Sequence, residues 1–97
     1  MSAIDDIAAE RQRQIEGEGF SLSRDDGYVH GQLARAAAAY AEFAGFSDSW
    51  RRNYVGPPRA WPWGMQWWKP RDRRTDLVRA GALIVAEIER LDRAKGA

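Results

Sequence analysis

The most regular hydrophobic pattern lies near the C-terminal end of the chain. Apolar or small residues repeat there with alternating spacings of four and three positions, at Leu77, Gly81, Ile84, Ile88 and Leu91. This repeat is typical of a helix that pairs closely with another helix. It predicts a helix over about residues 73–93, in which Gly81, Ala82 and Ala86 leave room for a close neighbour.

Two earlier segments show the same helical period. Residues 27–44 predict a helix with a face of alanines, against which the helix at 73–93 can pack closely. Residues 3–16 predict another, with one narrow and mostly apolar stripe: Ile4, Ile7, Ala8, Arg11 and Ile15. Its other faces are polar and are expected to be solvated, at Glu10, Arg13, Gln14 and Glu16.

Residues 46–72 show no sustained period and contain all four prolines and all five tryptophans. Long irregular segments in small domains are usually functional or disordered. So many aromatic residues favour an ordered segment, because they can bury enough surface to order it. We therefore predict an all-α protein, one domain over residues 1–97, with three helices and a functional Trp/Pro/Arg-rich loop between the second and third.

The two halves of the chain carry opposite charge. Residues 1–48 have nine Asp or Glu against four Arg, and residues 49–97 have eleven Lys or Arg against five acids. The basic half can meet an anionic ligand, or the acidic half of the same fold or of another subunit. The net charge of only +1 argues against single-stranded nucleic acid as the partner.

The composition also bears on location. No apolar run is long enough to span a bilayer, and no secretory leader is visible at the N-terminus. The chain has no cysteine, which excludes disulfides and thiolate metal sites. A cytoplasmic protein without membrane association is therefore expected.

Residues 61–74 combine aromatic surfaces with positive charge. Nucleobases stack on indole rings, and arginine forks and helix N-termini bind phosphate. The candidate ligand-binding residues are Trp61, Trp63, Trp67, Trp68, Lys69, Arg71, Arg73 and Arg74. The competing interpretation is that the tryptophans fill the core while the arginines pair with the acidic half. The second half of the stretch, Trp67 to Arg74, fits a ligand best, whereas Trp61 and Trp63 fit core or contact equally well.

Four further candidates stand before the alanine-rich segment: Asp25, Asp26, Tyr28 and His30. Their polar groups suit the edges of a base or ribose, bound within one subunit or from a neighbouring one. Capping of the following helix is the alternative for the two aspartates. The single histidine would need an acid or base partner to act in catalysis.

The sequence offers little for catalysis. The phosphate-binding loops G-x-x-x-x-G-K-[ST] and G-x-G-x-x-G are absent, and no nucleophile–base pair stands out. The E-E-x-x-E motif of MazG-type pyrophosphohydrolases is absent too. Side chains able to bind Mg²⁺ are Glu10, Glu16, Asp25, Asp26, His30 and Asp76. We expect no catalytic residue, metal or cofactor, and keep a magnesium-dependent nucleotide pyrophosphohydrolase as the alternative.

Several motifs follow one another over most of the chain: A-A-E-R-Q-R-Q-I-E-G-E-G-F at 8–20, R-D-D-G-Y-V-H-G-Q-L-A-R-A-A-A-A-Y-A at 24–41, W-P-W at 61–63, W-W-K-P at 67–70, and D-R-R-T-D-L-V-R-A-G-A-L-I-V-A-E-I-E-R-L-D-R at 72–93. In this order they resemble a group of small proteins of tailed bacteriophages and prophages. That group often has an acidic residue at the position of Gln32, which weakens a metal-binding interpretation here.

The resemblance implies a phage origin and a setting in the cytoplasm of an infected bacterium. Small phage proteins include inhibitors of host defence that sequester immune signals. By this analogy we expect a homo-oligomer that binds a nucleotide-derived signal, such as a cyclic nucleotide or an ADP-ribose derivative, without turning it over. A second alternative is an inhibitor that binds a host protein through the tryptophan-rich loop.

Overall fold

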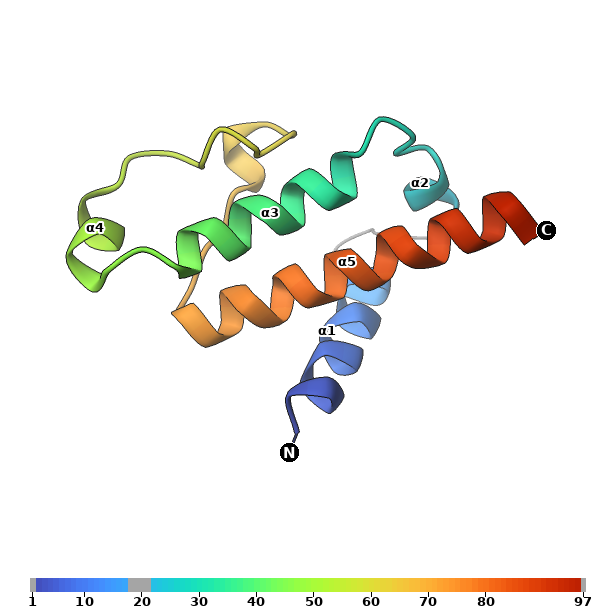
Figure 1. Ribbon diagram of the computed structural model, residues 1–97, viewed down its shortest axis with the longest axis horizontal. Helices are drawn as coiled ribbons and strands as arrows, with labels where there is room; N and C mark the ends of the chain where they lie inside the picture. Colours follow the sequence, from blue (N-terminus) through green and yellow to red (C-terminus); the bar gives the residue numbers. More distant parts are fainter. Residues whose placement is uncertain (1, 18–21, 97) are drawn as a thin grey trace.

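The computed structural model describes residues 2–17 and 22–96. Within these residues the chain forms five α-helices, one short 3-10 helix and no strand (Figure 1). They are α1 (Ala3–Gly17), α2 (Leu22–Asp26), α3 (Gln32–Ala44), α4 (Asp48–Asn53), the 3-10 helix η1 (Met65–Trp67) and α5 (Arg73–Gly96). The prediction of an all-α protein is confirmed. None of the described helices combines the length and apolarity needed to cross a membrane.

The long helix α5 organises the fold, with α3 lying alongside it and α1 meeting it at a steep angle (Figure 1). The core between α3 and α5 consists largely of alanines, with two leucines and a tyrosine: Leu33, Ala36, Ala37, Tyr40, Ala80, Leu83 and Ala86. Small side chains on both helices let the two backbones approach closely. The predicted packing of the alanine face against the last helix is confirmed.

The N-terminal helix α1 packs on α5 at a glycine. A Cβ atom at Gly81 would lie only 2.7 Å from Cδ1 of Ile7, so the missing side chain makes room for the isoleucine. The start of α1 is capped, because the backbone N–H of Asp5 donates a 3.1 Å hydrogen bond to Oγ of Ser2. These contacts fix the direction in which α1 leaves α5.

The helix predicted over residues 27–44 begins later, at Gln32. The residue before it, Gly31, has a φ of 79°, a left-handed conformation that interrupts the helix and suits glycine. The preceding residues instead form the separate helix α2, followed by a turn in which the N–H of Tyr28 donates to the carbonyl of Asp25 (2.9 Å). Two glycines in this turn, Gly27 and Gly31, explain why the helix does not extend back to residue 27 although the helical period does.

The loop expected over residues 46–72 contains two short helical elements. Ser47 caps α4, with its Oγ accepting a hydrogen bond from the N–H of Trp50 (3.2 Å). Tyr54 then packs back on the end of α3, with ring centroids 5.9 Å from Phe43 and 5.2 Å from Phe46. Aromatic packing orders this segment around α3 even where its backbone is irregular.

The alternating repeat on α5 does not form the contact with α3. Leu77, Ile84, Ile88 and Leu91 are each about half exposed, at 53, 50, 52 and 51%. The face that α5 buries carries a different set: Asp76, Ala80, Ala82, Leu83, Ala86 and Arg90. The expectation that the repeat forms the contact with the alanine-rich helix is therefore wrong, because α3 packs against smaller residues of α5, and the repeat meets α1 at Gly81.

Candidate functional site

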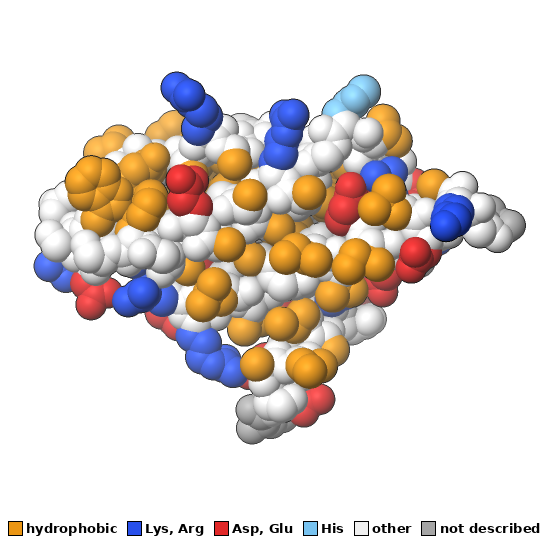
Figure 2. Space-filling view, in the orientation of Figure 1, with side chains coloured by type: hydrophobic (Ala, Val, Ile, Leu, Met, Phe, Trp, Pro, Cys, Tyr) orange, Lys and Arg blue, Asp and Glu red, His pale blue; other side chains and the backbone are white. Residues whose placement is uncertain are grey.

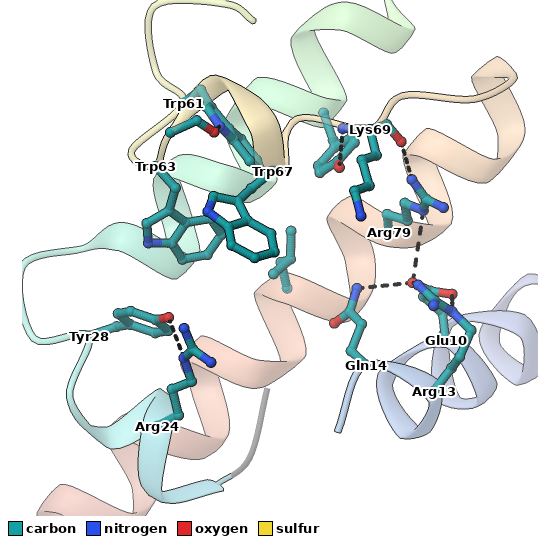
Figure 3. A pocket seen from close by; sticks show the side chains of 13 residues that line it. Glu10, Arg13, Gln14, Arg24, Tyr28, Trp61, Trp63, Trp67, Lys69 and Arg79 are labelled. Carbon is teal, nitrogen blue, oxygen red and sulfur yellow. Dashed lines mark hydrogen bonds and ion pairs between the residues drawn. The ribbon is translucent and has the colours of Figure 1, made fainter. Parts of the chain in front are cut away.

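A pocket of about 630 Å³ opens between the tryptophan-rich segment, α1, α5 and the residues around α2 (Figure 3). Its aromatic lining comes from Tyr28, Tyr40, Trp61, Trp63 and Trp67, and the remaining lining residues are charged or polar, apart from Gly64 and Leu83. A cavity of this size matches those that hold small organic ligands. The fold therefore brings together segments that lie far apart in the sequence.

Two of the tryptophans in the wall are braced by neighbouring rings. Trp63 packs against Tyr28 (centroids 5.2 Å apart) and meets Trp61 edge to face (5.3 Å, 89°). The indole N–H of Trp61 donates to the carbonyl of Gly64 (3.1 Å), which closes the turn over residues 61–64. This packing holds the Trp63 ring in place before any ligand arrives.

Trp67 and Trp68 are neighbours in sequence with different surroundings. Trp67 lines the pocket and is 58% exposed. Trp68 points to the core, with centroid distances of 4.7 Å to Tyr40 and 5.6 Å to Phe43. Trp61 does both, since it lines the pocket and packs 5.0 Å from Trp68. The alternatives of core and contact are thus divided among the tryptophans, and Trp68 belongs to the core.

The charged lining of the pocket is mainly basic: Arg13, Arg24, Lys69 and Arg79, against the single acid Glu10. Glu10 accepts hydrogen bonds from Arg13 (2.8 and 2.6 Å) and lies 4.0 Å from Nε of Arg79. Burial raises the pKa of Glu10, but the hydrogen bonds and charges of Arg13, Gln14 and Arg79 outweigh it, and the net pKa is lower than usual. The carboxylate stays ionised and holds two arginines at the pocket.

Arg79 is the basic residue that α5 contributes. Its Nη1 donates to the backbone carbonyl of Lys69, which ties the tryptophan-rich segment to the helix. The guanidinium carbon also lies 5.9 Å from the ring of Tyr40. The charge is thus oriented by one carbonyl, one ring and the carboxylate of Glu10.

Gln14 departs from the expected solvated face of α1. It is only 4% exposed and lines the pocket, and its Nε2 donates to Oε2 of Glu10 (3.1 Å). Its carbonyl oxygen is buried and has no hydrogen-bond partner among the described residues. Arg11, assigned to the inward stripe, is buried as predicted, whereas Arg13 and Glu16 are exposed as predicted. A buried acceptor without a partner is rare, and here it borders a cavity.

Three of the predicted phosphate ligands lie elsewhere. The N–H of Arg71 donates to Oδ1 of the buried Asp76 (2.7 Å), Nε of Arg73 donates to the carbonyl of Ala44 (2.9 Å), and Arg74 pairs with Asp6 (2.5 Å). All three border a second, open depression at the start of α5 and not the tryptophan pocket. These arginines follow the tryptophans closely in the sequence, but in the fold they lie at the start of α5 and do not line the pocket with the indole rings.

The four candidates around α2 also separate. Only Tyr28 lines the pocket, where its hydroxyl accepts a hydrogen bond from Nε of Arg24 (3.2 Å). Asp25 is fully buried 2.9 Å from Arg11, and burial raises the pKa of its carboxyl despite that partner. Asp26 pairs with Arg93 on the surface (2.8 Å). His30 is exposed and is not among the residues that line the pocket.

The acids considered for magnesium do not converge. The described residues contain no group of three His, Asp or Glu side chains suited to one metal ion. Asp25 is paired with Arg11 and Asp76 with Arg51 (3.0 Å), so both buried carboxylates have a basic partner.

Sequence reasoning missed most of the polar lining, namely Glu10, Arg13, Gln14, Arg24 and Arg79. One signal was present for Gln14. Ile7, Arg11 and Gln14 are spaced by four and three residues, so Gln14 shares the inward stripe of α1. No comparable signal marks Arg79, because the residues that it meets in the tryptophan-rich segment come from a distant part of the chain.

The fold and the site define a small all-α protein with an aromatic pocket rimmed by basic side chains. No protein-family model matches the chain, and neither a curated protein nor a solved structure matches it.

Proposed function

We propose that this protein binds and sequesters a small nucleotide-derived signalling molecule of host antiviral defence, without catalysis. The observation that carries the proposal is the composition of the pocket, in which indole and phenol rings stand beside four basic side chains and one acid. A ligand with an aromatic ring system and phosphate groups complements both kinds of lining.

The energetics suit such a ligand. Stacking of a base on an aromatic side chain contributes about 1–3 kcal/mol. Trp63 and Trp67 offer ring surfaces for one base, and Lys69 and Arg79 offer charge to a phosphate. Cyclic nucleotides and ADP-ribose derivatives both have this chemistry, and a pocket of about 630 Å³ has the volume for one of them.

The setting of the proposal comes from the resemblance to small phage proteins. A phage protein that lowers the free concentration of a defence signal would act in the cytoplasm of the infected bacterium. Sequestration needs tight binding and no turnover, and we propose that the protein does this as a homo-oligomer.

Calorimetric titration with cyclic dinucleotides, cyclic trinucleotides and ADP-ribose derivatives tests the proposal. We expect at least one to bind, and Trp63→Ala to weaken binding by about 5- to 150-fold, the equivalent of one lost stacking contact. Trp50→Ala is the matched control, since Trp50 is 57% exposed and lies outside the pocket. Absence of binding to every ligand, or equal loss in both variants, would overturn the proposal.

The fate of the ligand separates sequestration from catalysis. After incubation with Mg²⁺ and denaturation, chromatography should recover the ligand intact. Recovery of pyrophosphate or a nucleoside monophosphate would instead establish a hydrolase and contradict the proposal. A host protein recovered with the chain in equal amounts, in place of a small molecule, would favour the inhibitor alternative.

A further inference from the structure

Two residues that line the tryptophan pocket each hold a buried polar atom without a hydrogen-bond partner among the described residues. One atom is the side-chain oxygen Oε1 of Gln14 on α1, an acceptor, and the other is Nε of Arg79 on α5, whose N–H is a donor. The other atoms of this kind in the described chain belong to the ion pair of Arg11 and Asp25, which does not line the pocket. Buried polar groups are nearly always paired, so two exceptions at one cavity point to a partner that enters it.

The orientation of the Gln14 amide is set by Glu10. Nε2 of Gln14 donates to Oε2 of Glu10 (3.1 Å), and an ionised carboxylate can only accept. The lowered pKa of Glu10 keeps the carboxylate in this form. The amide therefore turns its nitrogen to Glu10 and its oxygen away from it, toward the side of the pocket on which Tyr28 and Trp63 lie (Figure 3).

The Nε of Arg79 lies beside the same carboxylate but is not hydrogen-bonded to it. Its distance to Oε2 of Glu10 is 4.0 Å, which is too long for a hydrogen bond, while Nη1 is engaged by the carbonyl of Lys69. Gln14 and Arg79 thus approach one oxygen of Glu10 from two helices. The unpaired acceptor and the unpaired donor lie on the same wall of the pocket, opposite the tryptophan-rich segment (Figure 3).

A glutamine at this buried position is poorly explained by packing. Gln14 is 4% exposed, and its oxygen has lost its hydrogen bonds to water without gaining one from the described residues. Glu10 does not need the amide as a partner, because Arg13 already donates two hydrogen bonds to it (2.8 and 2.6 Å). An apolar side chain of the same length would fill the position without this cost.

The two unpaired atoms match an edge of a ligand that has a donor beside an acceptor. Adenine presents such an edge, with the amino group N6 next to the ring nitrogen N7. A base that stacks on the indole of Trp63 or Trp67 lies flat, so its edge can meet the polar wall.

We propose that Gln14 and Arg79 form a hydrogen-bonding subsite that selects nucleotides whose base carries an amino group beside an unprotonated ring nitrogen. Oε1 of Gln14 accepts from the amino group, and the Nε–H of Arg79 donates to the ring nitrogen. The terminal torsion of a glutamine is broad, so a small rotation of the amide brings its oxygen to the ligand. The inference rests on the proposed function, because it names the base of the ligand that the pocket takes.

Calorimetric titration with two probes tests the subsite: adenosine monophosphate, and its analogue with hydrogen in place of the amino group. We expect the unchanged protein to bind the first about tenfold more tightly, the value of one hydrogen bond. Gln14→Met should remove this preference, because it keeps the length of the side chain and lacks the amide oxygen. Gln12→Met is the matched control and should keep the preference, since Gln12 is exposed on the same helix.

The protein without ligand supplies a second measurement. Gln14→Met removes a buried unpaired acceptor, so we expect the midpoint of thermal unfolding to rise by about 4 °C. Gln12→Met should leave the midpoint nearly unchanged, as is usual for exposed positions. A lower midpoint for Gln14→Met would show that the glutamine supports the fold, and would overturn its assignment to the ligand.

The outcomes separate this inference from the proposed function. Equal affinity for the two probes, or no binding of adenosine monophosphate by a protein that binds a signalling nucleotide, overturns the subsite alone. Absence of binding to the probes and to every signalling nucleotide overturns the proposed function, and the subsite with it. A preference for the amino group that Gln14→Met abolishes and Gln12→Met keeps supports both.

Discussion

The two faces of α5 differ in a way opposite to the usual pattern of a surface helix. The buried face carries three alanines and Leu83 together with Asp76 and Arg90, whereas the exposed face, seen in Figure 2, carries two leucines and two isoleucines. The difference arises because α3, itself rich in alanine, packs against the side of α5 that carries Ala80, Leu83 and Ala86. The size of the side chains on α5 therefore does not decide which of its faces is buried.

The tryptophan-rich segment contributes the large side chains that pack against this alanine-rich core. Trp61, Trp63 and Trp68 pack against the alanine-rich cluster from outside α3 and α5. The same rings form or brace the wall of the pocket. Stability and binding therefore use one set of aromatic residues, and substitutions in that segment need a fold control.

The largest effect is expected at Asp76, the polar member of the buried face. Its carboxylate is fully buried and accepts hydrogen bonds from Arg51 (3.0 Å) and from the N–H of Arg71 (2.7 Å). Asp76→Ala should lower the free energy of unfolding by about 3–5 kcal/mol, because Arg51 loses its buried partner. Denaturant unfolding measures the change, and the exposed Asp92→Ala should alter it by less than about 0.5 kcal/mol.

Adjacent residues on α5 provide the direct test of the two faces. Leu83 is 2% exposed and Ile84 is 50% exposed. Leu83→Ala should cost about 2–5 kcal/mol of unfolding free energy, as for other buried leucines. Ile84→Ala should cost under about 1 kcal/mol at concentrations low enough for the monomer, since half of its side chain already meets water. Equal losses from the two truncations in dilute solution would contradict the assignment of faces.

The buried pair beside α5 should appear in the pH dependence of stability. The folded-state pKa of Asp25 is raised by burial, so its protonated form is favoured in the folded protein. Its contribution to stability is present below the unfolded pKa and is lost as the pH rises through the raised value. Relative to Asp25→Asn, the unchanged protein should lose about 1.4 kcal/mol of unfolding free energy for every pH unit that separates the unfolded pKa from the folded one. A constant difference between the two proteins across this pH range would contradict the raised pKa.

The smallest effect is expected inside the pocket, at Gln14. Its buried carbonyl oxygen can accept a hydrogen bond from an amino group of a bound base. Gln14→Leu should weaken a ligand that carries a base amino group by about tenfold, the value of one hydrogen bond, and leave an analogue without that group nearly unchanged. Gln12→Leu is the control, since Gln12 is exposed on the same helix. Equal weakening of both ligands would show that Gln14 only supports the pocket.

Much of the fold could be predicted from the hydrophobic period. The helical period identified α1, α3 and α5, and the alanines of residues 34–41 indicated a close helix neighbour. The period shows which residues share a face, but it does not say which face is buried. Because Leu77 and Ile84 are large and apolar, the sequence favoured their face of α5 as the buried one, and the structure buries another face. The start of α3 was missed because the left-handed conformation of Gly31 is set by the turn around it.

The site could be predicted only in part. The indoles of Trp63 and Trp67 were recognisable from their density in the sequence, and both line the pocket. The sequence did not show which of the basic residues after the tryptophans line the pocket. Lys69 lines it, whereas Arg71, Arg73 and Arg74 make other contacts at the start of α5. Most of the basic residues that line the pocket, such as Arg79, lie on helices outside the tryptophan-rich segment.

The contact between Gly81 and Ile7 has a consequence for the shape of the pocket. Glu10, Arg13 and Gln14 of α1 line the pocket, and α1 rests on α5 at this glycine. A side chain added at position 81 would collide with Ile7 and move α1 outward, together with the polar wall that it carries. The distance between the polar wall and the tryptophans therefore depends on a residue that does not line the pocket.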